Sequence, residues 1–242
     1  MHHPDPEQVR TGRRFVSTVY ATVQHLDRNE RGRGRLQSLD DRGPAYGVGY
    51  LLETRRIQLR AEILGGDLDL DAHSPDGSVR VIGDTDYFML DLFADFSVLP
   101  TPSGDERRTW DLFCGGGGRL WRRDLRDGLI QDWYSLTTHF GGEYSHTYGF
   151  NRRWFVRGRI GATLFSSAYL SSPGFFFSRD TLADVNPRPG PLARLDIGLE
   201  HGRLHVGAFL DWTSYGESNT DNGFNQPDSS MTRIGLNVGF RW

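Results

Sequence analysis

The chain has 242 residues, a formal net charge of −3, 37% apolar residues and 12% aromatic residues. A near-neutral charge argues against a nucleic-acid-binding protein. The single cysteine, Cys114, excludes an internal disulfide and a cysteine-rich metal site. No run approaches the roughly 18 consecutive apolar residues that a membrane-spanning helix requires, and the length suits one all-β domain.

Residues 1–12 are polar, contain two prolines and show no period, so we expect a flexible tail. The first six residues lack the apolar stretch of a secretory signal peptide, so we expect the signal to be absent from this chain. A soluble protein is one explanation and a mature chain with its signal removed is the other. The strand pattern that follows favours the second.

From Arg14 onward, apolar side chains recur at every second position, which is the period of a β-strand with two different faces. In the first segment, for example, Val19 and Val23 share one face while Tyr20 and Gln24 share the other. About ten such segments are predicted, at residues 14–24, 46–52, 57–71, 88–98, 110–120, 134–150, 154–164, 194–200, 204–213 and 232–242.

Two glycine-rich sites interrupt this pattern. Gly65 and Gly66 are predicted to form a β-bulge, because glycine tolerates the kink that a bulge requires. The four glycines 115–118 superficially resemble a phosphate-binding loop, but no Gly-Lys-Ser/Thr follows them. We therefore predict that this run is a strand packed closely in a barrel wall.

The connections between the predicted strands alternate in length. Those near residues 54, 103, 151 and 202 are short, whereas those near 35, 75, 126, 180 and 223 are longer or more polar. An even number of strands joined by alternating short and long connections is typical of transmembrane β-barrels.

The last segment has the clearest alternation and ends the chain on an aromatic residue. One face is apolar and the other is polar or small, with Ile234, Leu236, Val238, Phe240 and Trp242 set against Arg233, Gly235, Asn237, Gly239 and Arg241. This strand resembles the final strand of the outer-membrane β-barrels of Gram-negative bacteria, which usually ends on Phe or Trp. The resemblance implies a closed antiparallel up-and-down transmembrane barrel over residues 13–242, with residues 1–12 as a periplasmic tail. We expect about ten strands, with eight or twelve as alternatives.

A soluble barrel or sandwich is the alternative fold, because turning every strand inside out preserves the period. The loop-length asymmetry, the terminal aromatic strand and aromatic residues near strand ends favour the membrane barrel. The expected girdle residues are Tyr46, Tyr50, Trp110, Trp154, Trp212 and Trp242.

The predicted inner face is rich in charge. We expect these residues to line the lumen: Arg60, Glu62, Asp91, Asp95, Asp111, Arg119, His139, Glu143, Arg157, Arg159, Arg194, Asp196, Glu200, His205, Asp211, Arg233 and Arg241. Burying such charges is costly unless they are paired. A salt-bridge network that fills the lumen is favoured over a small aqueous pore, since ten strands lie nearer the filled eight-strand barrels than the open sixteen-strand ones.

A candidate acidic or metal-binding cluster lies on a hairpin at the predicted extracellular rim. Asp67, Asp69, Asp71 and His73 could bind Ca²⁺ or activate water. The ten-strand layout is similar to that of the omptin proteases, which place Asp-Asp and Asp-His pairs at this rim. This chain departs from them, because Asp211 has no neighbouring histidine. A solvated charged edge is the favoured explanation, and no residue is assigned a catalytic role.

A second hydrolase hypothesis, a lipid A deacylase, draws on His139, Glu143, Ser145 and His146. Strand parity divides this set, since the first three point inward and His146 points outward. His146 would also lie near the periplasmic end, away from lipopolysaccharide. The sequence therefore gives this hypothesis little support.

Two groups in the predicted external loops are candidate contact sites. Arginine side chains there could pair with lipopolysaccharide phosphates, although an ordinary solvated loop is equally expected: Arg28, Arg31, Arg33, Arg35, Arg122, Arg123 and Arg126. The run Phe175-Phe176-Phe177 could fold over the barrel mouth, touch lipid or bind a partner.

The sequence thus predicts an integral protein of the Gram-negative outer membrane without cofactor or metal. A non-enzymatic role is favoured, whether narrow pore, binding protein or structural element; an outer-membrane hydrolase with a site at the extracellular rim is the alternative. The expected partners are outer-membrane lipid, lipopolysaccharide and, through the last strand, the barrel-assembly machinery. We expect a monomer that binds no nucleic acid.

Overall fold

The computed structural model describes residues 15–31, 38–54, 56–74, 78, 80–102, 107–124, 130–149, 152–171, 181–221 and 224–242. None of these residues belongs to a helix long and apolar enough to cross a membrane. The strands are β1 (Val16–Arg31), β2 (Ser38–Glu53), β3 (Ile57–His73), β4 (Arg80–Pro102), β5 (Arg108–Asp124), β6 (Ile130–Thr147), β7 (Arg152–Ser171), β8 (Thr181–Val185), β9 (Pro191–His201), β10 (Leu204–Tyr215), β11 (Thr220–Asp221), β12 (Phe224–Asn225) and β13 (Asp228–Arg241).

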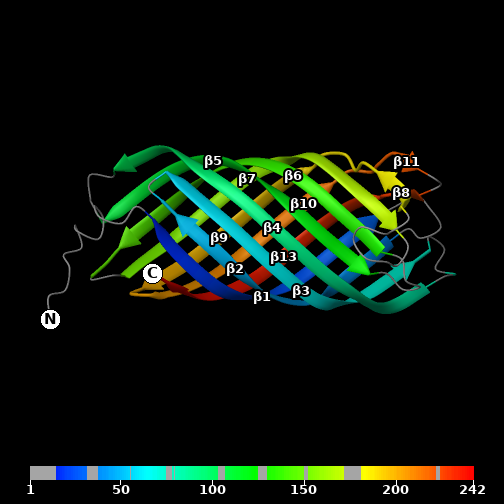
Figure 1. Ribbon diagram of the computed structural model, residues 1–242, viewed down its shortest axis with the longest axis horizontal. Coiled ribbons are helices and arrows are strands. Elements are labelled where there is room, and N and C mark those ends of the chain that lie inside the picture. The colour runs from blue at the N-terminus through cyan, green and yellow to red at the C-terminus, as the bar shows by residue number, and fades with distance from the viewer. Residues whose placement is uncertain are drawn as a thin grey trace.

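Ten of these strands form a closed antiparallel barrel, which Figure 1 shows from the side. Their order around the wall is β1-β2-β3-β4-β5-β6-β7-β9-β10-β13, and β13 pairs with β1 to close it. At the seam, Ser17 N donates to Trp242 O at 3.1 Å and Trp242 N donates to Ser17 O at 2.9 Å. β8 pairs with the end of β7, and β11 and β12 form a small separate sheet. The predicted ten-stranded antiparallel barrel is therefore confirmed.

The two ends of the barrel differ. Phe15 and Trp242, the first and last described residues, lie at one end, which we call the terminal end; the opposite end is the loop end (Figure 1). The turns after β2, β4, β6 and β9 lie at the terminal end, because successive strands run in opposite directions. Gly202 in the last of these turns has a φ of +61°, a conformation that favours glycine.

The outer face of the wall is apolar along its middle. Every barrel strand exposes large apolar side chains there, including Val48 (58%), Phe140 (61%) and Leu236 (62%). The six aromatic residues predicted for the girdles also point outward. A soluble barrel would turn these side chains inward, so this is the surface of a barrel surrounded by lipid.

Several strands continue further toward the loop end than the sequence pattern predicts. β4 begins at Arg80 rather than near residue 88, β6 begins at Ile130, and β7 runs to Ser171. On β3 the polarity of the two faces is inverted in this extension, because Leu68 and Leu70 are buried inside the barrel while Asp67 and Asp69 are exposed outside. The outer face of the extension is therefore suited to water rather than to lipid. The rule that apolar residues point outward, which holds in the middle of the wall, fails there.

The predicted bulge at Gly65 and Gly66 is wrong. These residues pair in unbroken register with Phe88 and Tyr87 of β4, and the register from β2 to β3 also continues without an inserted residue. Because no residue is inserted, the parity of β3 does not change, and the acidic residues that follow stay on the outer face.

Candidate functional site: a lumen filled with paired charges

The charged residues predicted to line the lumen all lie on the inner side of the wall. Most are buried, and the partly exposed ones are Arg60, Asp111 and Arg241. Their partners come from strands far apart in the sequence, so many of the ion pairs cross the barrel rather than join neighbouring strands.

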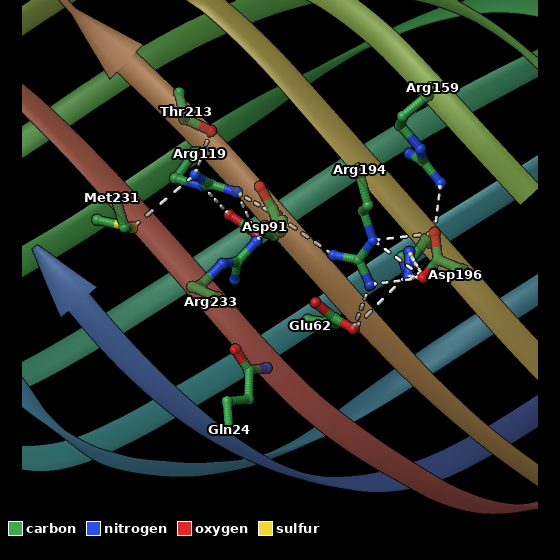
Figure 2. A network of polar contacts seen from close by, with 12 residues as sticks. Gln24, Glu62, Asp91, Arg119, Arg159, Arg194, Asp196, Thr213, Met231 and Arg233 are labelled. Atoms are coloured by element: carbon green, nitrogen blue, oxygen red, sulfur yellow. Dashed lines mark hydrogen bonds and ion pairs between the residues drawn. The ribbon is translucent and has the colours of Figure 1, made fainter.

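The middle of the network is a cluster of two aspartates and two arginines from four strands. Arg119 on β5 donates to Asp91 on β4 at 2.7 Å, and Arg233 on β13 donates to the other oxygen of Asp91 at 2.8 Å. Asp211 on β10 accepts from both arginines, at 3.1 Å from Arg119. Figure 2 shows Asp91, Arg119 and Arg233 converging on one another inside the wall. Each charge therefore faces two opposite charges, as a buried charge requires.

A second group joins this cluster toward the terminal end. Arg194 lies 3.3 Å from Asp211 and 2.9 Å from Asp196, so it links the two groups. Arg60 approaches Asp196 at 2.9 Å from the opposite side of the lumen. Glu62, which is fully buried, accepts from the Tyr20 hydroxyl at 2.7 Å and lies 3.6 Å from Arg60. Figure 2 shows the contacts among Glu62, Arg194 and Asp196.

The network continues to the terminal end through Asp95. This carboxylate accepts from His139 and Arg157, each at 2.5 Å, and Arg157 also donates to Glu143 at 2.8 Å. Arg153 then bridges Glu143 and Glu200, and Arg241 binds Glu200. A cavity of about 40 Å³ remains among these side chains, enough for about three water molecules.

The glycine run in β5 makes room for this network. A Cβ on Gly115 would lie 2.2 Å from Ala94 O and 2.8 Å from His139 Nε2, and one on Gly117 would lie 2.3 Å from the Phe93 ring. A side chain at Gly115 would displace the His139–Asp95 pair, and a side chain at Gly117 would displace the Phe93 ring. The run thus lies in a strand of the barrel wall, as predicted.

An aromatic layer closes the lumen above the charged network. Trp121 and Trp133 are 1% and 0% exposed, and their rings stack with centroids 5.2 Å apart. Tyr87 stacks on Trp121 at 6.2 Å, and Tyr215 packs against Trp133 at 5.0 Å. The other buried members of this cluster are Leu26, Leu64, Leu68, Met89, Ala168, Val185 and Met231.

A third, smaller charged layer lies on the aromatic layer at the loop end. The Arg28 guanidinium lies over the Trp121 ring at 3.8 Å and pairs with Glu30. Arg123 bridges Glu30, at 3.2 Å, and Asp41. Burial lowers the pKa of Arg28 to about 10, so it stays charged at neutral pH. The placement of Arg28 and Arg123 in solvated external loops is therefore wrong; both are buried inside the barrel.

Sequence reasoning missed several residues of the lumen. Arg153 follows the inward parity of Arg157 and Arg159, so extending the predicted strand by one step would have included it. Glu30 and Asp41 lie in a stretch that was predicted to be a polar loop, although both occupy inward positions when the alternation of their strands is continued. The other external arginines differ: Arg31 is exposed and Arg122 pairs with Asp132 at 2.7 Å.

Some predicted features lie outside the described residues. They are the tail at residues 1–12, the phenylalanine run at residues 175–177, and Arg33, Arg35 and Arg126.

The four candidate rim residues do not converge on one site. Asp67, Asp69 and His73 are exposed on the outer face of β3; Asp71 pairs with Arg80 at 2.8 Å, and His73 contacts Ser38 Oγ at 2.9 Å. Asp211, the possible late-strand partner, lies in the lumen with Arg119 and Arg233. Among the described residues, no group of three or more His, Cys, Asp or Glu side chains is placed to hold a metal ion.

The outer rim carries aspartates that face each other across β3 and β4. Asp67 stands directly opposite Asp86, and Asp69 stands opposite Asp84. A hydrogen bond with Asp67 raises the pKa of Asp86, and partial burial and the charges of Asp67 and Asp124 add to the rise. Because the folded pKa lies above the unfolded value, the resulting destabilisation is absent below the unfolded pKa. It develops as the pH rises through the folded pKa.

Replacing Asp86 with asparagine is therefore expected to stabilise the barrel slightly at pH 7 and to change nothing at pH 3. The gain should stay below about 0.5 kcal/mol, because exposed charges are screened by water. Urea unfolding of the two proteins at both pH values measures it. Equal destabilisation by Asp86→Asn at both pH values would show that the pair is not repulsive.

One comparison with a solved structure supports this architecture. No protein-family model matches the chain, and no curated protein sequence matches it. Among solved structures, the outer membrane protease OmpT from Escherichia coli aligns with a TM-score of 0.54 and 10% identity, over 96% of this chain and 97% of that chain. The translocator domain of the autotransporter NalP from Neisseria meningitidis aligns at 0.42 and 12% identity, over 93% and 88%. The Pseudomonas putida toluene transporter TodX aligns at 0.34 and 9% identity, over 94% and 89%. At such identities the OmpT likeness shows the fold alone, which is that of the Gram-negative outer-membrane β-barrels.

Proposed function

We propose that this protein is a sealed barrel of the Gram-negative outer membrane, with a structural or binding role and no solute conduction. The terminal end faces the periplasm and the loop end faces the exterior. In this orientation the barrel wall anchors the protein in the membrane. The extension of β3 to β7 lies in water outside the membrane and presents its outer rim and loops to the surroundings.

The observation that carries this proposal is the filling of the lumen in three layers. The charged network runs from Glu200 near the terminal end to Asp91 in the middle, the aromatic layer follows, and Arg28 and Arg123 lie above it. An ion that entered the lumen would have to separate several buried ion pairs, each of which leaves an uncompensated charge when broken. The arrangement therefore supports a plugged barrel over a narrow pore.

The hydrolase alternative receives less support from the geometry. A rim site would need an acid, a base and a space for substrate in one place. In the described part of the rim, Asp71 is engaged by Arg80, His73 contacts Ser38, and Asp211 is held in the lumen. The loop end therefore serves a binding role better than a catalytic one.

The proposed partners follow from the surface. Acyl chains cover the apolar outer face, and lipopolysaccharide surrounds the loop end, where Arg31 is exposed on the outer side of β1. Phe240 of the last strand, β13, and Trp242 directly after it point outward at the terminal end, each about half exposed (50% and 48%). We propose that the barrel-assembly machinery recognises this strand before it pairs with β1.

Ion current across a planar bilayer tests the proposal. The refolded protein is expected to give no stable current steps. The control variant Asp69→Ala, which changes an exposed residue of the outer rim, should behave in the same way. Asp91→Ala and Arg157→Ala are each expected to produce brief openings, because their buried partners lose neutralising charges. A steady current from the unaltered protein, with a known porin as positive control, would contradict the sealed barrel.

A further inference from the structure

The outer wall of the barrel contains an apolar groove of about 480 Å³ that crosses β5, β6, β7, β9 and β10. Its floor is formed by Gly142 and Gly158, which stand opposite each other on β6 and β7. A Cβ placed on Gly158 would meet no atom within 4 Å, so the wall is locally hollow. Phe140 and Ile160, 61% and 54% exposed, stand on one side of this floor.

The strand register places an aromatic cluster next to the groove, one step nearer the terminal end. Leu112 on β5 pairs with Gly142, and the next outward pair on the same strands is Trp110 and Tyr144. The Trp110 and Tyr144 rings lie 4.7 Å apart, and the Trp154 ring lies 5.2 Å from that of Tyr144. Such aromatic side chains are typical of the membrane–water interface.

The next two outward steps toward the terminal end carry basic side chains. Arg108 pairs with His146 across β5 and β6, and His146 in turn pairs with Trp154 on β7. One step further, Arg152 pairs with His201 across β7 and β9, with Arg152 Nε 3.4 Å from His201 Nε2. The acidic side chains in the halves of these strands nearest the terminal end point into the lumen instead. They are Asp111, Glu143, Asp196 and Glu200. The described outer surface below the groove is therefore cationic.

We propose that these three levels form a seat for one anionic phospholipid of the periplasmic leaflet. An acyl chain fills the groove over Gly158, the ester region lies at Tyr144 and Trp154, and the phosphate binds Arg152 and Arg108. Guanidinium groups suit phosphate oxygens, and basic residues next to a membrane attract anionic lipids. The inference rests on the proposed membrane orientation, which sets the leaflet.

A second copy of the chain fits this surface less well. A two-fold dimer through the groove would place the same patch of both copies together, which brings Arg152 and Arg108 of one copy toward those of the other. A recessed floor beside the projecting Phe140 and Ile160 also suits a flexible acyl chain better than another barrel wall. Charge and shape therefore both favour a lipid.

Quenching of tryptophan fluorescence by brominated lipids tests the seat, because Trp110 and Trp154 border it. The refolded protein is placed in phosphatidylcholine vesicles that contain a small fraction of either brominated phosphatidylglycerol or brominated phosphatidylcholine. We expect stronger quenching by the brominated phosphatidylglycerol. Arg152→Gln should lower the apparent affinity of the protein for phosphatidylglycerol about fivefold. Gly158→Leu, which fills the groove, should abolish the preference for phosphatidylglycerol over phosphatidylcholine.

Two matched controls lie away from the groove. Ala21→Leu enlarges an exposed outward residue of β1, and Arg56→Gln removes an exposed basic residue from the turn before β3; both should keep the full preference. Equal quenching by the two lipids in the unaltered protein would overturn the seat. A change of oligomeric state in Gly158→Leu, with quenching unchanged, would overturn it in favour of a second copy. Quenching by neither lipid would instead refute the membrane placement itself.

Discussion

Replacing Asp91 with alanine is expected to lower the free energy of unfolding by about 3–5 kcal/mol, the usual cost of removing one partner from a buried ion pair. Asp91 is fully buried and neutralises both Arg119 and Arg233. After its removal, Asp211 alone must compensate the two guanidinium groups. Urea unfolding in phospholipid vesicles, followed by tryptophan fluorescence, measures the loss.

Two further variants show whether the loss comes from the ion pairs. Asp69→Ala removes an exposed aspartate from the outer rim and should change the stability by less than about 0.5 kcal/mol. Adding Arg233→Met to Asp91→Ala should recover part of the loss, with a coupling energy of about 0.5–3 kcal/mol. Additive effects of the two substitutions would mean that Asp91 and Arg233 do not interact across the lumen.

Replacing Trp133 with alanine is the second change with a large expected effect, again about 3–5 kcal/mol. Trp133 is 0% exposed and packs between Trp121 and Tyr215, with ring centroids 5.2 and 5.0 Å away. Its removal leaves a cavity in the aromatic layer that neighbouring strands cannot close without shifting the barrel wall. The same unfolding assay measures this loss.

Trp110→Ala is the matched control for the aromatic layer. Trp110 is 55% exposed on the outer face, where lipid can replace most of its contacts. Its removal should therefore cost clearly less than the removal of Trp133. Equal costs at the two positions would mean that the aromatic layer is not a packed core.

The period of two was enough to predict which residues face the lumen in the middle of the wall. Asp91, Arg119 and Arg233 follow from strand parity alone, because one register step separates inside from outside. Their partners could not be predicted. Which arginine meets which aspartate across the lumen depends on the tilt and stagger of all ten strands, and no local pattern contains that information.

The loop end was harder to predict because the surroundings of the wall change there from lipid to water. Leu68 and Leu70 point inward and Asp67 and Asp69 outward, so the polarity of the faces inverts while the period stays the same. Arg28 and Arg123 were assigned to solvated loops because polar residues occupy both faces of their strands there, although each lies on the inner side of a longer strand. A search for alternation of apolar and polar residues could not find the end of β1.

The central claim is that the apolar face of the wall lies in lipid and the charged face inside, and Cys114 tests it most directly. It is the only cysteine of the chain and is exposed on the outer face of β5, directly opposite Phe140. A nitroxide attached to Cys114 in bilayer vesicles is predicted to be accessible to oxygen, which partitions into lipid, and shielded from a water-soluble nickel complex. Strong relaxation by the nickel complex with little effect of oxygen would place this face in water and contradict the account.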